Sequence, residues 1–164
     1  MQEIYKRYSI IVYRYLYSLT KNRALSEELM QETFYDAIKG INKFKGECKI
    51  SVWLCQIAKN KWKDYLSKSK KLNIVPINND IETLLFEDTI SESLEKREEL
   101  IQLYTEIHKL DENAREVFYL RLNCEFSFRE IGKILGKSEE WARITFYRGK
   151  IKLKEEFLKY EKWM

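Results

Sequence analysis

The chain has few residues that break helices. Its 164 residues include only 5 glycines and 1 proline, and this scarcity favours long helices over a sheet with many turns. No uninterrupted apolar run approaches the roughly 20 residues that a membrane-spanning helix needs. The N-terminus, MQEIYKRYSI, carries an acidic residue early and has no apolar signal core. These absences predict an all-α protein of the cytoplasm.

Cysteine and histidine are also scarce. An odd count of three cysteines (Cys48, Cys55 and Cys124) argues against a disulfide framework. Together with the single His108 they could in principle bind zinc, but no Cys-x-x-Cys pair or paired histidine is present, so buried thiols are favoured. No phosphate-binding loop, nucleophile elbow or metal-ligand cluster is present either. We therefore expect no enzyme, no metal and no cofactor.

Charge divides the chain into three parts. Residues 1–68 carry 13 basic and 7 acidic side chains, residues 69–99 carry 4 and 8, and residues 100–164 carry 13 and 11. The middle also contains the only proline, Pro76, and lacks sustained periodicity. We predict two small helical domains, 1–68 and 93–164, joined by a flexible linker over 69–92 with at most a helical turn at IETLLF.

Helical patterns fill the N-terminal block. YKRYSIIVYRYLYSLT is apolar nearly all round and predicts a buried helix. Ser26 is the expected N-cap of the next helix, whose inner face is Leu29, Thr33, Phe34, Ala37, Ile38 and Ile41. Ser51 is the expected cap of a third helix, with an inward side of Trp53, Leu54, Ile57, Ala58 and Tyr65. Between Lys39 and Lys68 there are 8 basic residues and 2 acidic ones.

The C-terminal block predicts four helices. The first is LEKREELIQLYTEIHKL, and Asp111 caps the second, whose inner face is Ala114, Val117, Phe118 and Leu122. Ser127 and Glu130 form a capping box for a short helix that buries Phe128, Ile131 and Leu135. Gly136 ends that helix and Ser138 caps the last one. A helix, a short glycine turn and a helix form the helix-turn-helix signature, although a plain helical corner has the same pattern.

The last helix favours a DNA-binding function. An inward stripe recurs at helical spacing and comprises Ala142, Phe146, Gly149 and Leu153. The opposite side carries Arg143, Ile144, Tyr147 and Arg148. Arginine binds guanine edges or phosphates and apolar groups contact thymine methyls, whereas a solvated helix rarely carries Tyr and Ile outward.

Three stretches in this order resemble the small extracytoplasmic-function (ECF) group of sigma-70 family RNA polymerase sigma factors. LSEELMQETFYDAI is similar to the polymerase-binding helix of the first sigma domain. FKGECKISVWLCQIAKNKWKDYL is similar to the promoter-melting loop and helix, and LDENAREVFYLRLNCEFSFREIGKILGKSEEWARITFYRGKIKLK to the second domain. The resemblance implies a sigma region 2-like domain at 1–68 and a region 4-like domain at 93–164.

The resemblance implies several binding roles. Glu28, Gln31 and Glu32 would bind core RNA polymerase, although an acidic solvated face is the alternative. Phe44 and Asn60 would capture a base flipped from the −10 element, while Lys59 and Lys63 follow its phosphates. Trp53 and Trp62 are assigned to the core, with a strand contact as the alternative for Trp62. The −35 duplex would be read by a set comprising Arg121, Arg143, Ile144, Tyr147 and Arg148.

Several positions depart from the family pattern. Glu140, Trp141 and Ala142 stand where the family often has Gly-Thr-Val, Thr145 where it often has Arg, and Gly149 where it often has Ala. Cys48, Lys49 and Ile50 are atypical of the capture loop. These are specificity positions, so the resemblance does not give the promoter sequence.

The resulting hypothesis is an ECF sigma factor that binds core RNA polymerase, directs it to promoters and promotes DNA opening. An anti-sigma protein is the further partner that the family implies. The alternatives are a conventional helix-turn-helix regulator with a helical effector domain and a helical adaptor. Neither alternative needs a second nucleic-acid site at SVWLCQIAKNKWKDYL.

Overall fold

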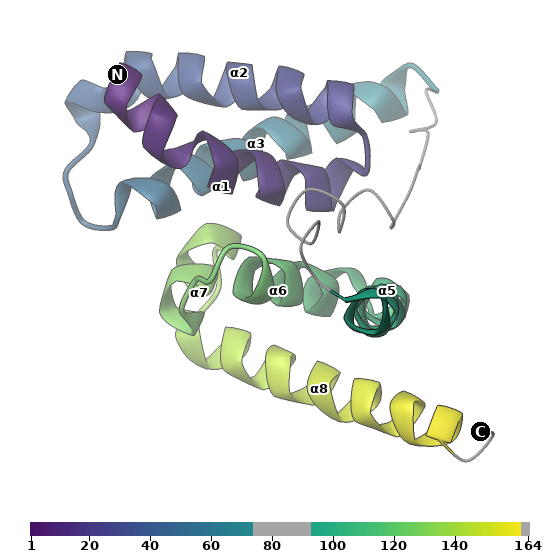
Figure 1. The fold of residues 1–164 in the computed structure, drawn as a ribbon. Coiled ribbons are helices and arrows are strands. Elements are labelled where there is room, and N and C mark those ends of the chain that lie inside the picture. The colour runs from purple at the N-terminus through teal and green to yellow at the C-terminus, as the bar shows by residue number, and fades with distance from the viewer. Residues whose placement is uncertain (74–92, 162–164) are drawn as a thin grey trace.

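Three helices form the N-terminal half of the structure, a computed structural model that describes residues 1–73 and 93–161. α1 (Gln2–Thr20) and α2 (Arg23–Gly40) are joined by a tight turn in which Lys21 is left-handed, with φ 54°. A 3-10 turn, η1 (Ile41–Lys43), follows, and α3 (Ile50–Lys71) packs against both α1 and α2. Figure 1 shows these three helices as one layer above the rest of the chain.

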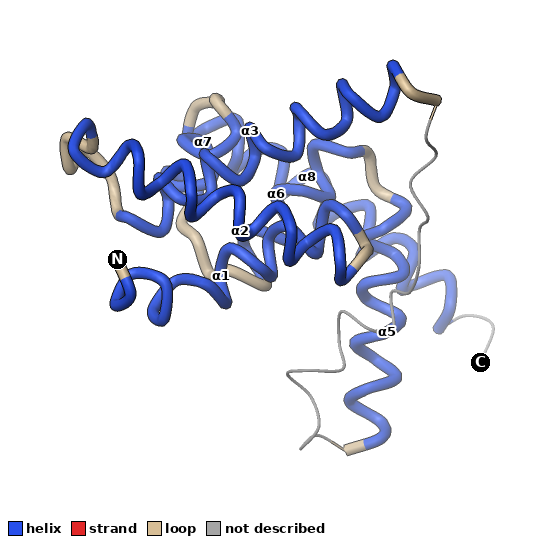
Figure 2. Tube along the Cα trace, turned by 90° about the horizontal axis from the view of Figure 1, so that it is seen from above, coloured by secondary structure: helices blue, strands red, loops and turns tan. Residues whose placement is uncertain are grey.

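Four helices form the C-terminal half. They are α5 (Leu94–Lys109), α6 (Glu112–Leu122), α7 (Phe128–Leu135) and α8 (Glu139–Glu161). All regular structure in the described ranges is helical, as Figure 2 shows, and the all-α prediction is confirmed. Most of the expected linker over 69–92, including the turn at IETLLF, lies outside the described residues, so its predicted flexibility stays a prediction. α3 itself continues to Lys71, which is inside the expected linker.

The predicted helix starts are correct in the C-terminal half. Asp111 accepts a hydrogen bond from Ala114 N, and Ser138 accepts one from Trp141 N. Ser127 and Glu130 form the predicted capping box, with both reciprocal hydrogen bonds present. Gly136 ends α7 with φ 67°, a conformation that a residue without Cβ adopts at little cost. The helix-turn-helix is therefore specified by local signals.

Two predicted helix starts in the N-terminal half are wrong. α2 begins one turn before the expected position, because Asn22 is extended and its side chain accepts from Leu25 N at 3.0 Å. Ser26 is instead buried inside α2, where its hydroxyl bonds to Thr20 Oγ1 at 2.6 Å. α3 begins at Ile50 after Lys49, which makes no side-chain cap, and Ser51 lies within the helix.

Some predicted inner faces are also wrong. Ile38 is exposed because it shares the outer face of α2 with Gln31 and Tyr35, at spacings of four and three residues. Leu122 is exposed at the end of α6. α1 is not buried throughout: Tyr5 and Ile10 in its first half are exposed, and its buried residues begin at Val12.

The two halves share one hydrophobic core. α1 contacts α6, and α3 contacts α7. Val12 and Leu16 of the N-terminal half belong to the same buried cluster as Val117 and Leu120 of α6. Figure 1 shows α6 between the N-terminal layer and α8, which explains why five consecutive residues of α6, Glu116–Leu120, are buried.

Candidate nucleic-acid interface

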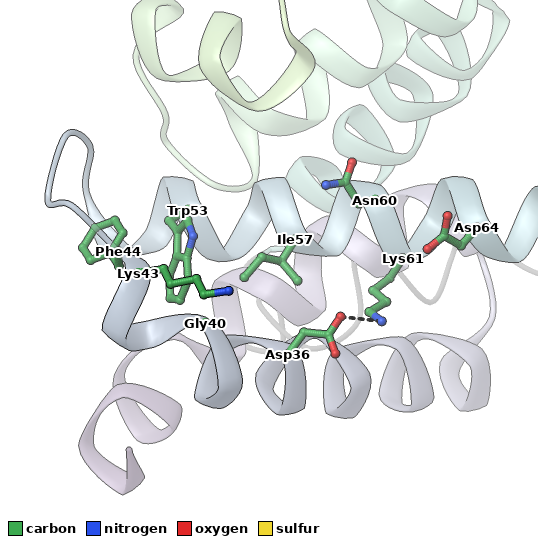
Figure 3. Close-up of a pocket in the computed structure, with 9 residues that line it drawn as sticks. All are labelled: Asp36, Gly40, Lys43, Phe44, Trp53, Ile57, Asn60, Lys61 and Asp64. Carbon is green, nitrogen blue, oxygen red and sulfur yellow. Dashed lines mark ion pairs between the residues drawn. The ribbon is translucent and has the colours of Figure 1, made fainter.

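A pocket of about 350 Å³ lies between α2, η1 and α3 (Figure 3). Phe44 follows directly after η1, and Asn60 projects from the middle of α3. Two residues that the sequence analysis paired for base capture therefore line the same pocket. Its full lining is Asp36, Gly40, Lys43, Phe44, Trp53, Ile57, Asn60, Lys61 and Asp64.

Aromatic surface is provided by two neighbouring rings of the pocket. The centroids of Phe44 and Trp53 lie 4.9 Å apart at an interplanar angle of 33°. Gly40 lies under the indole, and a Cβ at Gly40 would come 3.5 Å from it, an ordinary contact. Trp53 was assigned to the core from sequence, and it does pack against the core cluster. It is only half buried, so its ring also lines the pocket. By contrast, Trp62 is buried as predicted.

An ion pair joins α2 and α3 at one side of the pocket. Lys61 Nζ of α3 lies 2.6 Å from Asp36 Oδ2 of α2, as the dashed line in Figure 3 marks. This hydrogen bond raises the pKa of Lys61 above its usual value. The pair connects α2, the helix before the capture loop, to α3, the helix after it, on that side of the pocket.

The two lysines predicted for the −10 strand lie outside this pocket. Lys63 is exposed on α3. Lys59 points to the other half of the molecule, where its Nζ lies 2.7 and 2.8 Å from the two carboxylate oxygens of Glu116. Phe44 and Asn60 thus line one pocket, with Trp53 and Ile57 between them in Figure 3, and Lys59 lies apart from it.

The outer face of α8 is exposed as the sequence predicts. Arg143, Ile144, Tyr147 and Arg148 all lie at the surface, while Ala142, Gly149 and Leu153 are buried and Phe146 is half buried. Arg143 Nη2 is paired with Glu139 Oε1 at 2.9 Å, one helical turn away. Such an exposed pair is weak and is readily exchanged for a phosphate or a base edge.

Arg121 lies beside this face at the end of α6. Its Nη1 donates to the carbonyl oxygen of Phe126 at 2.9 Å, and its guanidinium carbon lies 4.5 Å above the Phe128 ring. Both contacts hold the side chain in one orientation. The Phe128 ring also packs against Phe146 and Tyr147, so Arg121 is coupled to the exposed face of α8 through Phe128.

The predicted polymerase-binding residues share one surface. Glu28, Gln31 and Glu32 are exposed on α2, opposite the buried Leu29 and Thr33. Their spacing of three and four residues puts them on one face of the helix. The arrangement gives a negatively charged patch that suits a basic partner.

The cysteines have the character of core residues. Burial raises the pKa of Cys55 well above its usual value and that of Cys124 to about 12, so both are thiols at neutral pH. Within the described residues, no three metal-ligating side chains gather at one point. No helix in the same ranges is both long and apolar enough to cross a membrane.

Comparison with known proteins identifies both halves. Residues 4–72 match the family model described as Sigma-70 region 2, and residues 100–153 match Sigma-70, region 4. The chain is 33% identical over 154 residues to the ECF RNA polymerase sigma factor SigM of Bacillus subtilis, covering 94% of this chain and 93% of SigM. The chain belongs to the ECF sigma factors of the sigma-70 family.

Further relatives agree with this assignment. The chain is 28% identical to the RNA polymerase sigma factor YlaC of Bacillus subtilis, over 97% of this chain and 92% of YlaC. The fold is similar to the sigma factor RpoE from Bartonella quintana, solved in complex with the anti-sigma factor NepR, with a TM-score of 0.73, 19% identity and 94% of each chain covered. It is also similar to CnrH in complex with the cytosolic domain of CnrY, with a TM-score of 0.67, 20% identity and coverage of 95% and 86%.

The family assignment decides between the functions considered from sequence. The sigma factor directs RNA polymerase to promoters, and it acts by binding rather than as an enzyme. The region 2 match over residues 4–72 argues against a conventional regulator with an effector domain, because region 2 is a sigma domain. The helix-turn-helix of α7 and α8 is the DNA-binding part of region 4.

Proposed function

We propose that the pocket beside Phe44 captures an unpaired base of the −10 element. Extruding a base from the duplex costs a few kcal/mol. Stacking on an aromatic ring returns about 1–3 kcal/mol per base. The observation that carries this proposal is that Phe44 and Asn60, 16 positions apart in the chain, line one pocket, with Trp53 as a second ring. Asn60 supplies an amide that can both donate to and accept from a base edge.

DNA opening in this account is driven by binding energy for the displaced strand. Lys63 is exposed on α3 and ready to contact a phosphate. Lys59 takes the same role once it has left Glu116. The captured base and the neutralised phosphates together stabilise the opened promoter, and no nucleotide hydrolysis is needed.

The −35 element is read as duplex by α8. Arg143 and Arg148 supply donors for guanine edges or phosphates, and Ile144 and Tyr147 supply apolar surface for thymine methyls. Arg121 contacts a phosphate and so sets the position of the domain on the duplex rather than its sequence preference. All four α8 residues are exposed, and this observation supports the assignment.

Core polymerase binds the acidic face of α2 at Glu28, Gln31 and Glu32. The working boundaries of the two domains are 1–68 and 93–164, with 69–92 between them, and the protein acts in the cytoplasm. An anti-sigma protein is proposed as a further partner, because RpoE from Bartonella quintana, whose fold is similar, was solved in complex with the anti-sigma factor NepR.

The proposed function is tested by run-off transcription with purified core polymerase and a library of promoter fragments. The expected result is transcripts from a subset of fragments that share two motifs at −35 and −10 spacing. Core polymerase alone is the control and should give no such subset. Transcripts that are the same with and without the sigma factor would contradict the proposal.

A further inference from the structure

The C-terminal half covers the side of the N-terminal half that carries Lys59. α6 packs on α1 and α7 packs on α3 (Figure 1). Val12, Tyr15 and Leu16 of α1 are completely buried, and Val117 and Leu120 of α6 lie in the same cluster. A shared core of this kind is a specific docked arrangement, because apolar side chains of both halves are removed from water together.

Glu116 lies at the centre of this interface. Its carboxylate accepts a hydrogen bond from Tyr15 Oη at 2.6 Å and two from Lys59 Nζ at 2.7 and 2.8 Å. The Lys59 side chain is only 13% exposed and that of Glu116 only 5%. Burial, followed by the Glu116 charge, raises the pKa of Tyr15 well above its usual value, so the phenol keeps the proton that it donates. Removal of Glu116 would leave a buried, unpaired lysine.

Three further polar contacts hold the rim of the interface. Lys49 Nζ, at the end of the capture loop, lies 2.7 Å from Glu130 Oε1 of α7. Lys133 of α7 donates to the carbonyl oxygen of Glu47 at 3.1 Å, and Gln56 of α3 donates to the carbonyl oxygen of Lys133 at 3.0 Å. The capture loop and α3 are therefore both attached to the helix-turn-helix.

This arrangement is incompatible with a promoter bound at both elements. The −10 and −35 elements are about 25 base pairs apart, or about 85 Å along duplex DNA at 3.4 Å per base pair. α8 packs directly on α7 and its 23 residues are about 35 Å long at 1.5 Å per residue. α7 therefore cannot remain in contact with α3 while α3 lies at one element and α8 at the other.

We infer that the free sigma factor is autoinhibited by this closed arrangement, with Glu116 as the residue that holds Lys59 away from DNA. The closed form withdraws Lys59 from the −10 surface, while Asn60, Lys63 and the outer face of α8 remain exposed. The inference rests on the proposed −10 role of Lys59. It gives the interface a second function besides packing: the same lysine binds either Glu116 or a phosphate.

The first test is whether the closed form exists in solution. A carbodiimide joins a lysine amine to a carboxylate only where the two are paired, and mass spectrometry identifies the joined peptides. The closed form predicts a Lys49–Glu130 product across the interface. The Lys61–Asp36 pair, within the N-terminal half, is the internal control. A Lys61–Asp36 product without a Lys49–Glu130 product would overturn the inference.

The second test opens the molecule. Glu116→Ala and the milder Glu116→Gln should increase the radius of gyration in small-angle X-ray scattering. They should also strengthen binding of a fluorescent single-stranded oligonucleotide of mixed sequence, by about tenfold for Glu116→Ala, since apparent affinity scales with the binding-competent fraction. Glu112→Gln removes the same charge from an exposed position of α6 and should change neither quantity.

The possible outcomes separate this inference from the proposed function. An unchanged radius of gyration in both Glu116 variants, with circular dichroism showing them folded, would overturn the closed form. Expansion without a gain in strand affinity would overturn the masking of Lys59. Run-off transcription by the unaltered protein is independent of either result, so the proposed function can stand while the autoinhibition fails.

Discussion

The two proposed DNA-binding surfaces of this sigma factor differ in how much of each is free. On α8, Arg143, Ile144, Tyr147 and Arg148 all lie at the surface, and the one described ion pair among them is a weak local one. On α3, Lys59 is held by a buried carboxylate from the other half of the chain. The first surface is complete within its own domain, whereas the proposed autoinhibition has the second completed only when the domains separate. Duplex recognition and strand capture are therefore expected to respond differently to changes at the interface.

The largest expected effect is on recognition of the −35 duplex by α8. Arg143→Ala combined with Arg148→Ala should reduce promoter-specific transcription by about 100-fold or more, because each base contact contributes about 1–3 kcal/mol. Binding to core polymerase should remain, since α2 is unaltered. Run-off transcription and a polymerase pull-down measure the two quantities, with Lys152→Ala on the exposed surface of α8 as the control. Full activity of the double variant would remove α8 from the −35 assignment.

The next largest effect is on capture of the unpaired −10 strand by Phe44. Phe44→Ala should lower the rate of productive initiation by about tenfold or more, through loss of base stacking worth about 1–3 kcal/mol. Phe44→Tyr keeps the ring and should retain most of the activity. Duplex recruitment, measured by gel shift on a promoter fragment, should be unchanged in both variants. A gel-shift defect as large as the initiation defect would mean that Phe44 acts before opening.

A smaller effect concerns the framework of α8. A Cβ at Gly149 would lie 2.5 Å from Cε2 of the buried Phe118 ring, so Gly149→Ala should destabilise the C-terminal half. Overpacking costs about 1–3 kcal/mol, offset by about 1 kcal/mol of improved helix propensity. Urea unfolding should show a lower midpoint, and Lys150→Ala on the exposed side is the control. An unchanged midpoint would mean that Phe118 moves aside freely. This contact also gives a physical reason for glycine where the family often has alanine.

The smallest effect is a pH dependence of closure. Lys21 Nζ of the α1–α2 turn donates to Tyr119 Oη of α6 at 2.8 Å. Burial, followed by the nearby Arg115 charge, lowers the pKa of Lys21 from 10.5 to about 8. The closed form therefore binds fewer protons than the open form between these values, and rising pH in this window favours closure. Below about pH 8 the lysine is charged in both forms and no further change is expected from it.

This dependence is measured by small-angle scattering of the free protein at about pH 7.5 and about pH 9.5. The radius of gyration should be smaller at the higher pH, and Lys21→Met should remove the difference. A radius of gyration that increases with pH would contradict the sign of the effect.

The sequence predicted features that depend on interactions between residues close in the chain, and it missed features that depend on packing between distant residues. The caps at Asp111, Ser127 and Ser138 and the two faces of α8 were correct, because each depends on residues within one or two helical turns. Ser26 was wrongly taken as a cap because its inward hydrogen bond to Thr20 is set by the packing of the α1–α2 turn. Local spacing identifies a helix face, but it does not identify which of two nearby polar residues begins the helix.

The candidate sites show the same limit. Phe44 and Asn60 were paired by resemblance, and the pocket that contains both also contains Trp53. The spacing of Trp53 on α3 correctly placed it against the core but gave no sign of the pocket. Lys59 was assigned to DNA, and its spacing gave no sign of Glu116, 57 residues later. A contact between residues so far apart depends on the docking of two domains. Neither charge counts nor periodicity carry that information.

The most direct test of the account is permanganate footprinting of a promoter selected by the run-off library, in complexes of core polymerase with the unaltered sigma factor or with Phe44→Ala. We predict reactive thymines across the −10 region with the unaltered protein and a strong loss of that reactivity with Phe44→Ala, at equal occupancy of the −35 element. A normal pattern of reactive thymines with Phe44→Ala would contradict the claim that this pocket captures the strand.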